Sequence, residues 1–331
     1  MTDHGTWPPA QARRPEPSWP TVIATTVRLW VDRHPVAGMK VTSWRLLALV
    51  LGAVIVVSGA ITGVVIGGEP TSSAALHRQA NPGAQSAVSL QVATATRNSA
   101  ARWIAGQVGP SAIVACDPAM CAALQANGLA ASRLIMLGTA AADPLGSDLV
   151  VATPVLRSQF GGRLASVYAP AVIASFGSGA GRIDIRAVAP DGAAAYNSAL
   201  TADRDARIAA GRQLMGNRRI TMSAADRAEF RAGRVDPRLL STLAALAAQH
   251  PVRILALGDP SPGANATVPL RSAEIAPARA GVHTTARLRS MLTFLQAQRL
   301  PFLPMRAVLV GKSALSVEYA APGPLGLLSG T

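Results

Sequence analysis

The chain has 331 residues, half of them apolar, and its 31 basic residues outnumber its 17 acidic residues to give a net charge of +14. This length accommodates one or two domains with a sizeable core. Every basic residue except Lys40 and Lys312 is an arginine. Together with the abundant alanine and glycine, that bias is typical of a GC-rich genome, so the charge by itself does not indicate a nucleic-acid-binding protein.

Residues 1–45 are predicted to form a cytoplasmic, mostly disordered tail. The first half is proline-rich ("TWPPAQARRPEPSWP"), a composition typical of disordered segments. The next stretch, "TVIATTVRLWVDRH", places apolar residues at helical spacing beside arginines. This pattern fits either a short helix on an anionic lipid surface or a loose tether.

Residues 46–68 are predicted to form a transmembrane helix. The run "LLALVLGAVIVVSGAITGVVIGG" contains neither a charge nor a proline, and as a helix it would extend about 34 Å, enough for the ~30 Å hydrocarbon layer. A cleaved signal peptide has a shorter apolar core, about 7–15 residues. Within the run, Gly59, Gly63 and Gly67 lie four apart, a spacing that permits two such helices to self-associate.

Basic residues predict the orientation of this helix. Glu69 follows the run directly, and the next basic residue is Arg78. Basic flanks stay in the cytoplasm, so the sequence predicts a single-pass plasma-membrane protein whose N-terminus is cytoplasmic and whose C-terminal domain is extracytoplasmic. The basic residues before the run are Arg13, Arg14, Arg28, Arg33, Lys40 and Arg45.

The extracytoplasmic part is predicted to be an α/β domain with two related, partly parallel lobes. A linker is expected at 69–86, the first lobe at 87–195, a connecting helical segment at 196–235 and the second lobe at 236–331. In the first lobe, "SAIVAC", "PAMCAALQANG" and "SRLIMLG" read as strand, helix and strand. Such a β-α-β unit is the building block of a parallel sheet, and Asp117 is expected to cap its helix.

Three segments of the first lobe recur in the same order in the second. "IAGQVGPSAIVACDP" resembles "LAAQHPVRILALGDP", "TPVLRS" resembles "VPLRS", and "APAVIASFGSGAGRIDIRAVAPDG" resembles "MRAVLVGKSALSVEYAAPGPLG". The recurrence predicts a duplication in which Asp117 matches Asp259 and Arg157 matches Arg271. Ligands collect at the carboxyl ends of strands in open α/β sheets, so these four are the candidate ligand-binding residues. The alternative is that these residues are structural: the aspartates cap helices, and the arginines form ion pairs with carboxylates.

Cys116 and Cys121 are the only cysteines. Four residues separate them, whereas a thioredoxin-like redox centre has two. The extracytoplasmic histidines, His77, His250 and His283, show no ligand spacing to them, so no metal site is predicted. Because thiols outside a bacterial membrane tend to be oxidised, a disulfide is the leading interpretation, with two buried free thiols as the alternative.

One segment, "NSAARWIAGQVGPSAIVACDP", resembles the helix–strand opening of the extracytoplasmic domains of polytopic, lipid-phosphosugar-dependent glycosyltransferases. The resemblance covers about 20 residues, and this chain has neither the many spans nor the acidic membrane-loop motif of that family. More broadly, the whole chain resembles single-pass membrane proteins of actinobacteria. That resemblance implies a cell-envelope setting and no particular chemistry.

The sequence contains no familiar catalytic or nucleotide-binding motif, and no cofactor is predicted. We therefore expect a membrane-anchored binding or assembly protein of the cell envelope. The alternative is a glycan-modifying enzyme, or an accessory subunit of an envelope glycosyltransferase, with a site between the lobes. Expected partners are membrane lipid, anionic envelope polymers or a partner membrane protein, and not nucleic acid, since no aromatic residues are interleaved with the basic ones.

Overall fold

The computed structural model describes residues 82–138, 143–259, 261–263, 268–279, 281 and 283–328. Within these residues, no helix is both long enough and apolar enough to cross a membrane. The predicted transmembrane helix at 46–68, its glycines, the cytoplasmic tail and most of the linker lie outside the described residues.

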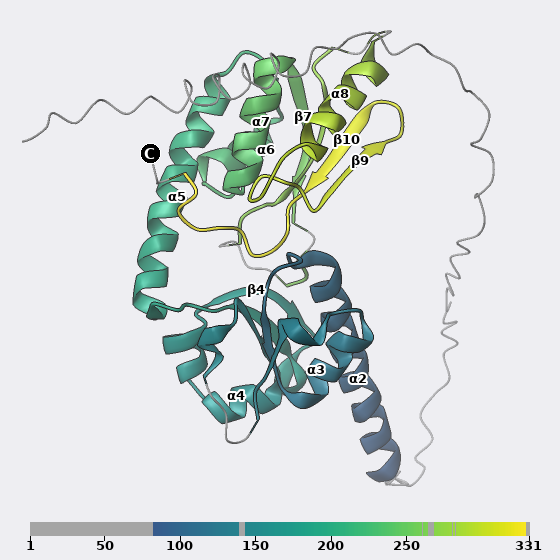
Figure 1. Cartoon of the computed structure of the whole chain (residues 1–331), viewed down its shortest axis with the longest axis vertical. Helices are drawn as coiled ribbons and strands as arrows, with labels where there is room; N and C mark the ends of the chain where they lie inside the picture. The colour runs from purple at the N-terminus through teal and green to yellow at the C-terminus, as the bar shows by residue number, and fades with distance from the viewer. Residues whose placement is uncertain are drawn as a thin grey trace, which may run out of the picture.

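The protein is α/β, with one mixed five-stranded sheet in each of two lobes. Figure 1 shows the first lobe in blue and teal below the second lobe in green and yellow. The long helix α5 (Gly192–Gly216) runs along one side of both lobes. The chain therefore passes from one lobe to the other through a single continuous helix.

The first lobe has strand order β2-β1-β3-β5-β4. Strands β1, β2 and β3 are parallel, as the β-α-β pattern predicts, while β5 is antiparallel to β3 and β4 is antiparallel to β5. The elements in chain order are α2 (Pro82–Gln107), β1 (Val114–Cys116), α3 (Pro118–Ala126), β2 (Leu134–Met136), β3 (Leu149–Ala152), α4 (Pro154–Phe160), β4 (Ala171–Phe176) and β5 (Ile183–Ala187).

The second lobe has strand order β6-β7-β8-β10-β9. Strand β6 is parallel to β7, and every other neighbouring pair is antiparallel. Residues 196–235 were expected only to connect the lobes, but they contribute β6 and α6 to the second one. The elements are β6 (Ile220–Thr221), α6 (Ala224–Arg231), α7 (Pro237–Gln249), β7 (Val252–Gly258), β8 (Ser272–Pro277), α8 (Thr284–Gln296), β9 (Arg306–Val310) and β10 (Ala314–Glu318).

The two sheets correspond in strand order but not in strand direction. In each lobe a helix leads into a strand that ends at an aspartate, and an antiparallel hairpin closes the sheet. However, β3 runs parallel to β1, whereas β8 runs antiparallel to β7. A parallel neighbour usually requires a crossover helix, and no described residue between β7 and β8 is helical. "TPVLRS" therefore follows β3 as the start of α4, whereas "VPLRS" leads into β8. The predicted equivalence of Arg157 and Arg271 is wrong.

The lobes bury their sheets in different ways. In the first lobe, alternate strand residues enter two clusters on opposite faces, one beneath α2 and α3 and the other beneath α4. In the second lobe, a single large cluster joins one face of the sheet to α7 and α8. The first lobe thus has three layers and the second has two.

The chain returns to the first lobe after β10. The backbone N–H of Ala321 donates to the carbonyl of Gln107 at 2.8 Å, and Ala321 accepts from the N–H of Gly109 at 3.4 Å. Further on, the N–H of Gly326 donates to Oδ1 of Asp203 in α5 at 3.1 Å. Figure 1 shows this segment, residues 319–326, as a yellow trace crossing the junction. We call it the C-terminal strap, because it ties the second lobe to the first.

Candidate functional site at the junction of the lobes

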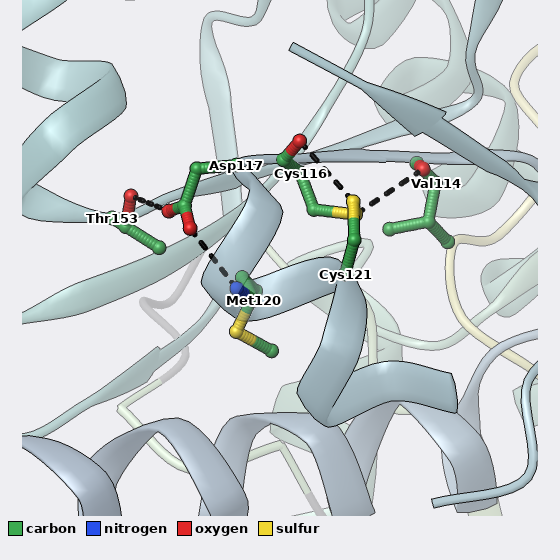
Figure 2. The surroundings of a disulfide bond; sticks show 6 residues. All are labelled: Val114, Cys116, Asp117, Met120, Cys121 and Thr153. Carbon is green, nitrogen blue, oxygen red and sulfur yellow. Dashed lines mark hydrogen bonds between the residues drawn. A yellow bond between two sulfur atoms is a disulfide. The ribbon is translucent and has the colours of Figure 1, made fainter. Parts of the chain in front are cut away.

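The two cysteines fix the point where β1 enters α3. Cys116 is the last residue of β1 and Cys121 lies in the first turns of α3, and the two buried residues are joined by a disulfide. Figure 2 shows Asp117 beside this bond, with its carboxylate turned away from the sulfur atoms. The disulfide therefore stabilises a strand–helix corner.

Asp117 is engaged on both carboxylate oxygens within the first lobe. Its Oδ1 accepts from the backbone N–H of Met120 at 3.0 Å, so it is the N-cap of α3. Its Oδ2 accepts from Oγ1 of Thr153 at 2.5 Å, and Thr153 is itself the N-cap of α4. Asp117 therefore joins the starts of two helices, which is the structural alternative stated for it above.

Arg157 also bonds within the first lobe. From the last turn of α4, its guanidinium donates to the carbonyls of Ala152 at 3.0 Å and Ala180 at 2.8 Å, and to that of Arg182. Two of these carbonyls belong to the turn between β4 and β5. Arg157 thus fixes that turn against α4, and these contacts do not place it at the junction.

Arg271 and Asp259 do lie at the junction, where they form a buried ion pair. The side chain of Arg271 is 2% exposed, and its Nε lies 3.1 Å from Oδ1 of Asp259. Its Nη1 lies 3.7 Å from Oε1 of Glu318 and donates to the carbonyl of Tyr319 at 2.6 Å. Asp259 also accepts a hydrogen bond from the backbone N–H of Ser261 at 3.0 Å. Asp117 likewise accepts from the backbone N–H of a residue that follows it, Met120.

The same guanidinium reaches across to the first lobe. Nη2 of Arg271 donates to Oε1 of Gln107, at the end of α2, at 2.6 Å. The guanidinium carbon also lies 5.9 Å from the ring centre of Trp103, a cation–π distance. Burial lowers the pKa of Arg271, and the nearby carboxylates of Asp259 and Glu318 oppose that shift. One side chain therefore links both lobes through charge, hydrogen bonding and ring contact.

Two further buried ion pairs secure the C-terminal strap. Arg238 Nη2 lies 2.7 Å from Oδ2 of Asp236 and also donates to the carbonyl of Ala320 at 2.8 Å. Arg207 Nε lies 2.7 Å from Oδ2 of Asp203, whose other oxygen binds the strap. Sequence reasoning missed both pairs. The four-residue spacing of Asp203 and Arg207 on one helix was the available signal.

The space left at the junction is small. A cavity of about 50 Å³ lies between β4, α5 and the strap, and Asp203, Asp236, Ser261 and Arg271 are among its lining residues. A water molecule occupies about 30 Å³ in the liquid, and ligand pockets have about 300–1,000 Å³. Around Arg271 and Asp236, the described residues therefore fill the junction and leave no room for a ligand in this cavity. The four predicted residues do not line one cleft: Asp117 and Arg157 bond within the first lobe, whereas Asp259 and Arg271 meet at the junction.

A larger groove lies beside the junction, between the first lobe and the strap. Its volume is about 340 Å³, and its walls are mostly apolar side chains such as Leu145 and Leu325. Asp148 contributes a carboxylate, whose Oδ2 accepts from the N–H of Ile113 at 2.7 Å. Tyr196 contributes a phenol, and burial, with a smaller effect from Asp203, raises its pKa. The groove therefore offers one exposed carboxylate and one phenol, and its described lining residues include no histidine, cysteine, lysine or second carboxylate.

No protein-family model, no curated protein and no solved structure matches this chain. Within the part of the chain that the structure describes, no three His, Cys, Asp or Glu side chains are grouped to hold a metal ion. The site is therefore interpreted from its own geometry and charge.

The segment from α5 to α6 carries a concentration of exposed positive charge. Between residues 203 and 236, Asp203, Glu229 and Asp236 are paired with arginines and Asp226 completes the capping box of α6. Asp205 is the only exposed acidic residue in that interval. Arg204 donates to the carbonyl of Ala232 at 3.2 Å, which brings the end of α6 beside α5. We define the α5–α6 basic surface as the exposed arginines of this region that have no ion pair within the described residues: Arg204, Arg212, Arg218, Arg219, Arg227 and Arg231.

Proposed function

We propose that this protein is a single-pass, membrane-anchored binding or assembly protein of the cell envelope, with a cytoplasmic N-terminus and an extracytoplasmic two-lobed domain. The observation that carries the proposal is the filled junction. Where an enzyme would hold its substrate between two lobes, the described residues place buried ion pairs and a cavity of about 50 Å³, and the groove of about 340 Å³ beside them carries a single carboxylate. Such a junction fixes the lobes as one unit that presents its outer surfaces.

Two features support the placement outside the membrane. The Cys116–Cys121 disulfide suits an oxidising compartment. Helix α2 begins at Pro82, shortly after the apolar run at 46–68, and its residues 89–95 are exposed. Figure 1 shows this end of α2 extending beyond the first lobe, away from the second lobe. A stalk of this kind would hold the second lobe at the far side from the membrane.

The α5–α6 basic surface supports an anionic partner. Arginine forms bidentate hydrogen bonds with phosphate and carboxylate groups, and the acidic residues of this region are almost all engaged internally. Most of these arginines belong to the end of α5 near the second lobe or to the second lobe itself. With the stalk directed toward the membrane, the surface faces envelope polymers rather than the lipid to which the chain is anchored. We infer that the partner is an anionic envelope polymer.

Protease accessibility tests the placement. Protease added to intact spheroplasts should digest the chain beyond residue 69 and leave a membrane-bound fragment that contains the N-terminus. The matched control is the same digestion after lysis, when both sides become accessible. Protection of the two-lobed domain in intact spheroplasts would reverse the proposed orientation.

Binding of a defined polymer tests the partner. Full-length protein in detergent should bind immobilised poly(glycerol phosphate) and not neutral dextran. Replacing Arg212, Arg227 and Arg231 by Gln should weaken that binding about tenfold or more at low salt and reduce its salt dependence. The control replaces Arg287, Arg289 and Arg299, exposed arginines outside the surface, by Gln and removes the same charge. Equal losses in both variants would mean that net charge, and not this surface, determines binding.

A further inference from the structure

Strand β9 is a free edge of the second sheet. The strand order ends at β9, which pairs with β10 over its full length, Arg306–Val310. On its other side, no described residue pairs with it. Its outward backbone N–H and C=O groups are therefore available to another strand.

The side chains of this edge are apolar on both faces of the sheet. Val308 is 36% exposed, Leu309 36% and Val310 41%. Successive strand residues point to opposite faces, so Leu309 lies on the face covered by α8, and Val308 and Val310 lie on the face without helices. Leu300 and Leu303, in the preceding loop, are also exposed. This is the longest uninterrupted run of exposed large apolar residues within the described strands.

Within the described residues, most of the usual protections of an edge strand are missing from β9. Natural proteins prevent their edge strands from pairing with other chains by means of proline, β-bulges, inward-pointing charges or a covering helix or loop. Strand β9 contains no proline, and its register with β10 has no shift, unlike the β4–β5 and β7–β8 pairs. Arg306 is its only charged residue, and it lies opposite Glu318 of β10. The edge is thus open to pairing over its whole length.

We propose that β9 is a self-association edge, on which β9 of a second copy of this chain pairs antiparallel across a two-fold axis at Val308. The five residues of β9 pair along their whole length with those of the second copy only when the two-fold axis passes at the middle residue, Val308. In that register, Arg306 lies opposite Val310 of the second copy, so no like charges face each other directly. The partner strand must be apolar on both faces, a requirement that β9 itself fulfils. The result is a continuous ten-stranded sheet with an isologous interface.

The expected association is weak in dilute solution. A single strand pair buries less than the ~1,200–2,000 Å² of a standard stable interface. Confinement to a membrane would raise the effective concentration of the two β9 strands. Only this step of the inference rests on the proposed function, that is, on the proposed membrane anchor. The experiments below therefore use the full-length chain in native membranes or at high concentration in detergent.

Cysteine cross-linking tests the register. In either kind of antiparallel pair, directly opposite Cα atoms lie about 4.5–5.5 Å apart, within the ~4.4–6.8 Å that a disulfide spans. Val308→Cys should therefore give a disulfide-linked dimer under mild oxidation, at least tenfold more than Arg306→Cys, whose two Cα atoms would lie about 14 Å apart. Val155→Cys, at an exposed valine in α4, is the control for random collision.

Charge repulsion provides a second test that needs no new thiol. Val308→Lys places two ammonium groups at the axis and should shift the concentration for half-dimerisation at least tenfold upward, measured by sedimentation or light scattering. Val155→Lys should leave it unchanged. The inference fails if Val308→Cys cross-links no more than either cysteine control, if it links to a protein of different mass, or if Val308→Lys leaves dimerisation intact. Topology and polymer binding do not involve β9, so either proposal can fail without the other.

Discussion

Nε of Arg271 lies 3.1 Å from Oδ1 of Asp259, and both side chains are buried where the two lobes meet. Asp259 directly follows strand β7, and Arg271 directly precedes the neighbouring strand β8. The pair therefore closes the connection between two adjacent strands while the rest of the guanidinium reaches Gln107 of the other lobe. Together with the strap, Arg271 joins the two lobes.

Replacing Arg271 by Met should lower the free energy of unfolding by about 3–5 kcal/mol, because Asp259 and Glu318 would remain buried without their cation. Urea denaturation of the purified chain measures the change. Arg157→Met is the control: it removes bonds to backbone carbonyls only, and we expect a loss of about 1–2 kcal/mol. A loss below 1 kcal/mol for Arg271→Met would show that the junction does not depend on this charge.

The disulfide should be present in protein purified without reducing agent. Non-reducing alkylation followed by mass spectrometry should find no modified Cys116 or Cys121, whereas prior reduction should expose both. Replacing both by Ala should cost about 2 kcal/mol, since the closed loop is short. Two alkylated thiols without reduction would refute the oxidised state and weaken the extracytoplasmic placement.

Asp117→Ala should destabilise the first lobe by about 1–3 kcal/mol, because it removes the cap of α3 and leaves the buried hydroxyl of Thr153 without its acceptor. Asp117→Asn should lose less than half as much, since Asn caps helices about as well as Asp. Thermal or urea unfolding followed by circular dichroism measures both. Equal losses would indicate that the negative charge, and not the cap, is the stabilising feature.

Tyr319 should make the protein less stable at high pH. Burial raises its pKa to about 12, while a hydrogen bond with Thr242 acts in the opposite direction. The unfolded chain loses this proton near pH 10, so the stabilisation is complete below pH 10 and is lost as the pH rises from 10 to 12. The expected slope is about 1.4 kcal/mol per pH unit in that window.

The comparison with Tyr319→Phe isolates this effect from other titrating groups. The variant should be less stable near neutral pH, since Thr242 loses its buried partner, but its stability should fall less steeply between pH 10 and 12. Denaturant midpoints at pH 8, 10 and 11.5 are sufficient. Parallel curves for the two proteins would show that Tyr319 does not titrate in this window.

Several local features follow directly from the sequence. The α/β class, the β-α-β unit, the closing hairpins and the cap at Asp117 depend on hydrophobic periodicity and on residues a few positions apart. Asp259 follows its strand as the recurrence predicts, and its carboxylate also turns to a following backbone N–H. The predicted span at 46–68 rests on the same kind of local pattern, and it remains a prediction.

The arrangement of these elements depends on contacts between distant residues, which local patterns do not encode. Strand β8 runs opposite to the direction expected from the recurrence because no described residue between β7 and β8 forms a crossover helix, and this separates Arg271 from Arg157. The strap returns to Gln107 through bonds that join residues more than 200 positions apart. The sequence by itself therefore determined the α/β class, the β-α-β unit and the cap at Asp117, whereas α4 and β6 did not follow from it. Only the tertiary structure decided how the two lobes meet, because Arg271 reaches Gln107 and the strap reaches Arg238 and Asp203 from distant parts of the chain.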